Sequence, residues 1–203
     1  MKQEIFLRDG QSGEAVPAEL ISGISDQTIE MWANTWQPAF DQVRNDFQLN
    51  SVPKEKWPED AHWDWGNKLA MTKGCLSYEP YSIMANGSLE GLMLLNNTKF
   101  ARLPQQRGES LIYIEFLAVA PWNRKELCNP RRYVGVGAIL ADLAIQISLA
   151  SEFKGRIGLH SLPGALSFYR NRLKMSELGP DQSHNNLLYF EMTPEQAETF
   201  LAN

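Results

Sequence analysis

Residues 131–150, RRYVGVGAILADLAIQISLA, decide the fold. A short glycine-containing turn opens directly into a long apolar helix, and an apolar strand over residues 111–120 precedes it. The first N–H groups of a helix have no partner within the helix, and the helix dipole adds partial positive charge there. Because Gly135 and Gly137 have no side chains, a phosphate can come close to this backbone. The turn therefore predicts a pyrophosphate site, although an ordinary strand-to-helix turn has the same local pattern.

Two other phosphate-binding loops do not fit the turn. No lysine followed by serine or threonine comes after the glycines, as a P-loop requires. The third glycine of a dinucleotide fingerprint would fall at Leu140. The turn must therefore be interpreted together with the rest of the chain.

The composition is that of an ordinary globular protein, and we expect a single domain over residues 1–203. The chain is 43% hydrophobic and 21% charged, which is enough for one sizeable core. Its net charge of −5 argues against a broad nucleic-acid-binding face, although Arg131 and Arg132 could form a local basic patch. Cys75 and Cys128 lack metal-ligand spacing.

The expected location is the cytoplasm, without a membrane segment. Two cysteines without a pairing pattern suit free thiols in a reducing compartment. The first residues, MKQEIFLRDGQSGE, contain no long apolar run and do not resemble a signal peptide. No stretch reaches the ~18 apolar residues of a membrane span.

The first half of the chain is predicted to begin with a short strand at residues 4–7, followed by a helix. Ser25 or Asp26 can cap that helix, and Pro38 should kink or break it. Its apolar residues recur at helical spacing: Ile29, Trp32, Trp36 and Phe40.

A second helical stretch follows Pro58 and carries the cluster His62-Trp63-Asp64-Trp65. Both tryptophans could pack in the core or in a lid. Alternatively the cluster forms the wall of a substrate pocket, where aromatic faces and Asp64 would suit a cationic amine. His62 and Asp64 are not three or four residues apart, so they do not predict a metal pair on a helix.

A run of strands occupies the middle of the chain. Residues 75–85 and 88–95 flank Asn86-Gly87, a two-residue hairpin signal. The strand at 111–120, LIYIEFLAVA, has Glu115 as its only charge. A carboxylate there is costly to bury unless it is paired, hydrogen-bonded or protonated. Glu115 therefore lies at a solvated edge or in a structural hydrogen bond, or it is a base.

The C-terminal part alternates strands and helices. Strands are predicted at residues 156–160 and 187–192, and a helix at 165–173. Thr193-Pro194-Glu195-Gln196 has capping-box spacing and should start a last helix. The order of elements predicts an α+β fold with helices around a mixed sheet.

Three blocks in order resemble the GNAT superfamily of acyl-CoA-dependent N-acetyltransferases. Residues 114–121, IEFLAVAP, resemble its fourth strand, and Arg132-x-x-Gly135-x-Gly137 its pyrophosphate loop. Residues 165–169, ALSFY, resemble a later helix motif, and 88–95 its third strand. The chain departs from the family in two places. Residues 125–130 look inserted, so that Arg124 competes with Arg132 for the basic position of the pyrophosphate loop. Leu173-Lys174-Met175 replaces the usual end of the later helix.

The resemblance implies a mixed, mostly antiparallel central sheet flanked by helices, and acetyl-CoA as cofactor. Backbone groups of the fourth strand would bind the pantetheine arm and polarise the thioester carbonyl. Amides of residues 134–138 would cradle the pyrophosphate. The cofactor-binding residues implied are Leu117, Ala118, Val119, Arg132, Tyr133, Val134, Gly135, Val136, Gly137 and Ala138.

The resemblance also implies catalytic roles for two side chains. Glu115 is the first candidate for the base that removes a proton from the acceptor amine, directly or through a water. His160 is the second candidate, unless it is a hydrogen-bonded residue at a strand end. Tyr169 would return a proton to the leaving thiolate, unless it only packs beside Phe168. No metal is required.

The function implied is transfer of an acetyl group from acetyl-CoA to a primary amine of a small molecule or peptide. One alternative is a non-catalytic acyl-CoA-binding sensor or partner-binding module with the same fold. Another is a toxin-type acetyltransferase acting on charged tRNA, against which the negative net charge argues. The sequence leaves open the acceptor and a homodimer.

Overall fold

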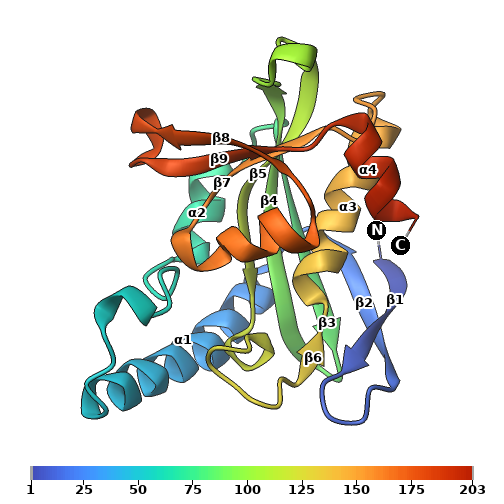
Figure 1. Cartoon of the computed structure of the whole chain (residues 1–203). Coiled ribbons are helices and arrows are strands. Elements are labelled where there is room, and N and C mark those ends of the chain that lie inside the picture. The colour runs from blue at the N-terminus through green and yellow to red at the C-terminus, as the bar shows by residue number, and fades with distance from the viewer. Residues whose placement is uncertain (1, 203) are drawn as a thin grey trace. The chain divides into compact units, whose positions relative to one another are not determined.

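The computed structural model describes residues 2–202, whose helices and strands are labelled in Figure 1. The chain divides into two compact units. The first comprises Met1–Cys75, Glu79–Met93 and Leu117–Gly137, and the second comprises Leu76–Tyr78, Leu94–Phe116 and Ala138–Asn203. The expectation of a single domain over residues 1–203 stays a prediction.

The sheet of the first unit has the strand order β6-β1-β2-β3-β4. Pairing of β1 with β2, of β1 with β6 and of β2 with β3 is antiparallel. The bounds are Lys2–Asp9 for β1, Ala15–Ser22 for β2, Tyr78–Ala85 for β3, Ser88–Phe100 for β4 and Tyr133–Val134 for β6. The hairpin predicted at Asn86-Gly87 is confirmed, because these residues connect β3 and β4.

Strand β2 was not predicted from the sequence. It pairs with β1, which is longer than the strand expected at residues 4–7, and the two form a hairpin. Lys2 pairs with Ile21 at one end of the hairpin, and Arg8 pairs with Ala15 at the other. Only Ala18 and Leu20 of β2 are buried. A strand with so few buried positions, and with Pro17 in it, has a weak apolar alternation.

Helix α1 spans Asp26–Leu49 without a break, so a break at Pro38 is wrong. Its N-cap is Ser25, whose side chain accepts from the backbone N–H of Thr28. Trp36 and Phe40, on either side of Pro38, are buried, and the Trp36 indole donates to the Leu89 carbonyl at 3.0 Å. Burial of both aromatic side chains offsets the hydrogen bond that proline removes.

Helix α2 spans only Trp65–Thr72, so His62 and Trp63 precede the helix. Asp64 is its N-cap, with Oδ1 accepting from the backbone N–H of Asn67 at 2.9 Å and Oδ2 from its side-chain amide at 2.8 Å. Trp65 is 1% exposed, in keeping with core packing.

The sheet of the second unit has the strand order β4-β5-β7-β9-β8. Strands β5 and β7 are parallel, and the pairs β7–β9 and β8–β9 are antiparallel. The bounds are Ser110–Val119 for β5, Val136–Ala150 for α3, Ile157–Ser161 for β7, Ser176–Asp181 for β8, Leu187–Glu191 for β9 and Pro194–Leu201 for α4. The capping box predicted at Thr193 and Gln196 is confirmed at the start of α4.

Two features of this unit differ from the prediction. Strand β8 was missed, because it contains Gly179 and Pro180 and none of its residues is buried. The helix expected at residues 165–173 is a 3-10 turn at Pro163–Ala165 followed by a π-helix at Phe168–Arg172. Pro163 and Gly164 explain the tight start, because neither residue favours an α-helix interior.

The predicted α+β class is confirmed, with helices and a mixed, mostly antiparallel sheet. Both cysteines are free thiols. Among residues 2–202, no helix has the length and apolar character needed to cross a membrane.

Candidate functional site

The glycine turn at residues 131–137 is held against strand β1. Tyr133 pairs with Asp9 and Val134 pairs with Arg8, which makes the start of the turn the short strand β6. The Gly10 N–H donates to the Arg132 carbonyl at 2.8 Å. A Cβ added to Gly10 would lie 1.7 Å from the Arg131 carbonyl oxygen, so this close approach requires glycine. The turn is therefore fixed before α3 begins.

Gly135 is the residue of the turn that most favours ligand binding. Its φ is +92°, a backbone conformation that other residues adopt only with strain. It is exposed, and a Cβ added to it would meet nothing within 4 Å. Helix α3 begins at the next residue, Val136. An anion could thus approach the backbone at the start of a 15-residue helix.

The buried carboxylate of Glu90, in β4, contacts both the glycine turn and the segment that precedes the inserted loop. Its Oε2 accepts from the Trp122 indole at 2.6 Å and from the Asn123 amide at 2.7 Å. Its Oε1 lies 3.3 Å from the guanidinium of Arg132, which also covers the Trp122 ring at 4.5 Å. Burial raises the pKa of Glu90, and the surrounding donors oppose that rise. The carboxylate thereby ties the 3-10 segment Pro121–Asn123, which follows β5, to the glycine turn.

The inserted residues 125–130 form a loop whose two ends lie together. The Arg132 N–H donates to the Trp122 carbonyl at 2.9 Å, and the Tyr133 N–H donates to the Asn123 side chain at 2.9 Å. Residues 122–123 and 132–133 are therefore direct neighbours. The inserted loop therefore leaves from and returns to the same place, and the segment after β5 stays next to the glycine turn.

Arg124, the competitor of Arg132 for the basic position, is engaged elsewhere. Its guanidinium makes two 2.6 Å hydrogen bonds to Asp60 and also donates to the Val119 carbonyl at 3.0 and 2.8 Å. Its side chain is 17% exposed, whereas that of Arg132 is 44% exposed. Of these two arginines, Arg132 is the more accessible to an anion.

The part of β5 expected to hold the cofactor lies beyond its pairing with β7. That pairing covers Ile112, Tyr113 and Ile114 of β5. The strand continues to Val119, and residues 115–117 and 119 are partly exposed, while Ala118 is buried. The strand is therefore continuously buried only at residues 111–114. Backbone groups of its second half lie outside the register with β7.

Glu115 and Tyr169 belong to the second unit. Glu115 Oε2 is buried and has no hydrogen-bond partner in the structure. Tyr169, in the π-helix, is 6% exposed and packs against Phe168 and Phe190. Burial raises the pKa of Tyr169, so its phenol keeps its proton at neutral pH.

His160, the second candidate base, already uses both ring nitrogens. Nδ1 is 2.5 Å from the Tyr113 hydroxyl and Nε2 is 3.0 Å from Asp181 Oδ2. Burial lowers the pKa of His160 to about 4, although the hydrogen bond to Asp181 opposes this shift. Both nitrogens of His160 thus have partners, whereas Glu115 Oε2 has none, so Glu115 is the more available of the two to an acceptor amine.

The cluster at residues 62–65 has local structural roles. Asp64 caps α2 with both oxygens occupied, and the Lys68 ammonium lies over the Trp63 ring at 4.6 Å. The carboxylate and the aromatic face, which the alternative of a pocket wall would have offered to a cationic amine, therefore have partners within the chain.

Sequence reasoning missed the residues that act through long-range pairing. Glu90 and Asp60 lie more than 30 residues before their partners, so no local motif identifies those partners. One signal was present: a charged residue in the apolar run LEGLMLL at 89–95 needs a buried partner.

Comparisons with known proteins were made on sequence and on structure. No family model matches the sequence, and no curated protein matches it. FeeM, an N-acyl amino acid synthase from uncultured soil microbes, has a similar structure with a TM-score of 0.53 and 10% identity, covering 90% of this chain and 93% of its own.

Two further solved structures are similar. One is described as a GNAT-family acetyltransferase from Desulfovibrio desulfuricans, with a TM-score of 0.50, 12% identity, and coverage of 87% of this chain and 99% of its own. The other is a mutant of the toxin AtaT bound to the C-terminus of the antitoxin AtaR and acetyl-CoA, with a TM-score of 0.50, 16% identity, and coverage of 68% and 81%. The chain therefore has the fold of the GNAT acetyltransferases.

Proposed function

We propose that the protein is an acyl-CoA-dependent N-acetyltransferase that transfers an acetyl group to a primary amine. The observation that carries this proposal is the glycine turn, in which Gly135 presents an open backbone at the start of α3. The GNAT fold supports it, as does the acetyl-CoA bound to the similar toxin AtaT.

The turn would hold the pyrophosphate of acetyl-CoA. Backbone N–H groups of residues 134–138 can donate to phosphate oxygens, and Arg132 adds a positive charge that is partly offset by Glu90. The cofactor supplies an acetyl thioester, whose carbonyl oxygen becomes negative during attack. N–H groups of Leu117, Ala118 and Val119 would orient the pantetheine arm and stabilise that charge.

The two side chains of the second unit would move the protons. As the amine nitrogen attacks the acetyl carbon, Glu115 takes the amine proton on its unpartnered Oε2. Tyr169 would return a proton to the thiolate that leaves when the carbon–sulfur bond breaks. One proton would leave the acceptor and one would reach the departing thiol, and transfer of the proton from Glu115 to Tyr169 through solvent would restore both side chains.

The acceptor in this proposal is a small-molecule or peptide amine, and the free thiols of Cys75 and Cys128 suit a cytoplasmic location. The homodimer that the sequence left open stays a proposal.

Turnover of acetyl-CoA tests this function. The full chain is incubated with acetyl-CoA and a panel of polyamines, amino acids, aminoglycosides, peptides and charged tRNA. Free thiol release and acetylated product are measured separately. We expect thiol and acetylated amine to form in equal amounts with one acceptor class. When that acceptor is left out, we expect no release of thiol. Binding of acetyl-CoA without turnover of any amine would contradict catalysis and favour the binding-module alternative. Product on charged tRNA alone would favour the toxin-type alternative.

A further inference from the structure

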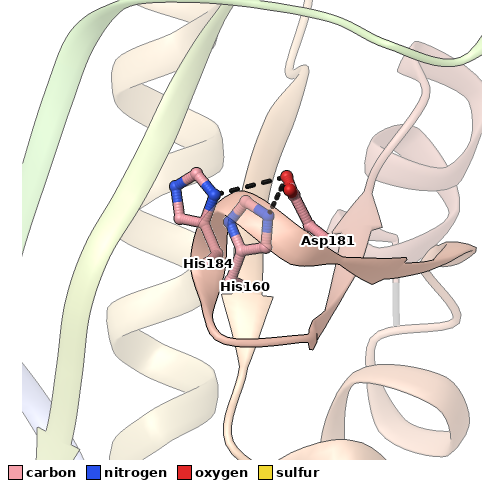
Figure 2. A group of neighbouring side chains, drawn as sticks. All are labelled: His160, Asp181 and His184. Atoms are coloured by element: carbon pink, nitrogen blue, oxygen red, sulfur yellow. Dashed lines mark hydrogen bonds and ion pairs between the residues drawn. The ribbon is translucent and has the colours of Figure 1, made fainter.

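Three potential metal ligands meet at one place in the second unit, far from the glycine turn in the sequence. Asp181 Oδ2 lies 3.0 Å from His160 Nε2 and 3.3 Å from His184 Nδ1. One ligand atom from each residue lies within 4.8 Å of the other two. Figure 2 shows the carboxylate facing nitrogens of both imidazoles. His160 lies on β7, Asp181 ends β8, and His184 lies in the 3-10 helix Gln182–His184, so three segments converge here.

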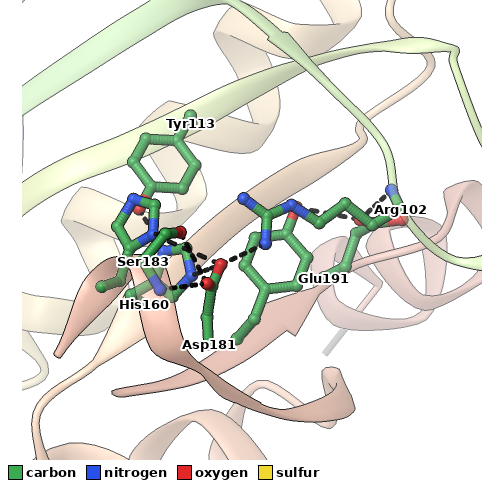
Figure 3. Close-up of polar contacts among 8 residues, drawn as sticks. Arg102, Tyr113, His160, Asp181, Ser183 and Glu191 are labelled. Atoms are coloured by element: carbon green, nitrogen blue, oxygen red, sulfur yellow. Dashed lines mark hydrogen bonds and ion pairs between the residues drawn. The ribbon is translucent and has the colours of Figure 1, made fainter. Parts of the chain in front are cut away.

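Two of the three ligands, Asp181 and His160, are each held in place by their other polar atom. Asp181 Oδ1 accepts from the Ser183 N–H at 2.9 Å and from its hydroxyl at 2.6 Å, which directs Oδ2 toward the histidines. Tyr113 lies 2.5 Å from His160 Nδ1, which leaves Nε2 facing Asp181 (Figure 3). Hydrogen bonds of this kind orient ligands around protein-bound metals and fix the histidine tautomer.

The spacing suits a tetrahedral ion. Ligand atoms at about 2.0–2.1 Å from a zinc ion are about 3.3 Å from one another in tetrahedral geometry. The distances of 3.0 and 3.3 Å from Asp181 Oδ2 are within a few tenths of an ångström of that separation. The two rings are stacked 3.7 Å apart, and the His184 side chain is 40% exposed. His184 Nδ1 also lies 2.9 Å from the Ser183 hydroxyl, so this outer ring would have to rotate away from that contact to share an ion with His160.

In the structure, the guanidinium of Arg102 is the positive charge that pairs with Asp181 Oδ2. Arg102 Nη1 lies 2.5 Å from Asp181 Oδ2, and its side chain is 45% exposed and crosses the Tyr189 ring at 4.3 Å. The backbone at this position is anchored separately, because the N–H groups of Arg102 and Leu103 donate to the buried Glu191 at 2.6 and 3.0 Å. The guanidinium can therefore leave Oδ2 without moving the strand connection.

We propose that His160, Asp181 and His184 form a binding site for a divalent transition-metal ion, with zinc as the expected metal. Two imidazoles and one carboxylate form a donor set that zinc accepts, with water as the fourth ligand. The bound ion would tie β7 to the end of β8. This site does not rest on the proposed acetyl transfer, in which Glu115 and not His160 is the base.

Zinc titration of the full, untagged chain tests the proposal. The cysteines are replaced in all proteins (Cys75→Ser, Cys128→Ser), so that thiols do not bind the metal. After chelator treatment and dialysis, zinc is titrated by calorimetry and by competition with a chromophoric chelator, and cobalt binding is followed by visible absorption. We expect one metal per chain and a cobalt spectrum typical of tetrahedral coordination.

Three variants give the test its specificity. His184→Ala removes an exposed ligand without opening the core, and we expect zinc affinity to fall about 100-fold or more. His62→Ala removes the remaining histidine of the chain, which lies outside the cluster, and should bind zinc like the parent protein. Arg102→Met removes the competing cation and should tighten zinc binding.

Several results would overturn the proposal. They are the absence of stoichiometric zinc binding in the parent protein, equal affinity in His184→Ala and the parent, and weaker binding in Arg102→Met. Melting temperatures without metal show that each variant is folded, and added zinc should raise the melting temperature of the parent but not that of His184→Ala.

Discussion

Glu115→Gln is expected to lower kcat about 100-fold or more while leaving the affinity for acetyl-CoA nearly unchanged. The substitution preserves the size of the side chain and removes its ability to take a proton. Binding of the cofactor is assigned to backbone groups and to Arg132, so it should not depend on this carboxylate. Steady-state kinetics with the acceptor found in the turnover screen, and calorimetry with acetyl-CoA, give the two quantities separately.

The pH dependence separates this role from that of Tyr169. For the unaltered protein we expect kcat to rise with pH, and Glu115→Gln should flatten the rise. Tyr169→Phe should also lower kcat, about 100-fold, but should keep the rise because the base is intact. Glu126→Gln, an exposed carboxylate in the inserted loop, is the matched control and should change neither. If Glu115→Gln retains both rate and pH profile, the base is His160 or the acceptor itself.

Glu90→Ala is expected to destabilise the protein by about 3–5 kcal/mol, because removing one member of a buried charged cluster leaves its partners unpaired. The indole of Trp122 and the amide of Asn123 would both lose their acceptor, and Arg132 would lose its ion pair. Glu90→Gln should lie in between, since an amide oxygen replaces only part of the carboxylate. The free energy of unfolding in urea measures the loss.

Glu19→Ala provides the control for that measurement. Glu19 forms an exposed ion pair with Lys2 in the same unit, and such pairs contribute about 1 kcal/mol or less. If Glu90→Ala costs no more than this exposed substitution, Glu90 does not hold the turn as described.

Local signals predicted the fold well where a few neighbouring residues decide the structure. The Asn86-Gly87 turn, the capping box at Thr193 and the helix after Gly135 were all found in this way. Strands β2 and β8 were missed because each gains its stability from a partner strand rather than from its own apolar pattern. Helix α1 passes through Pro38 because Trp36 and Phe40 are buried beside it, which only the folded chain reveals.

In the candidate site, too, the parts made of neighbouring residues could be predicted and the parts made by long-range contacts could not. The turn at residues 132–137 could be predicted, because its glycines and the following helix are contiguous. Its supports could not, because Glu90 meets Trp122 and Arg132 only after the strands have paired. The histidine cluster could not be predicted either. His160 and Asp181 are 21 residues apart, and only the pairing of β7, β9 and β8 brings them together.

Calorimetric titration of acetyl-CoA into the unaltered protein and into Gly135→Val tests the central claim most directly. Gly74→Val is the matched control, because Gly74 also has a positive φ and open space around it. Both substitutions strain the backbone by about 1–2 kcal/mol, but only Gly135→Val places a branched side chain where the pyrophosphate would lie. We predict one acetyl-CoA per chain in the unaltered protein and in Gly74→Val, and at least about a tenfold weaker affinity in Gly135→Val, equivalent to 1.4 kcal/mol or more. Equal affinity in the two variants, or no binding to the unaltered protein, would contradict the account.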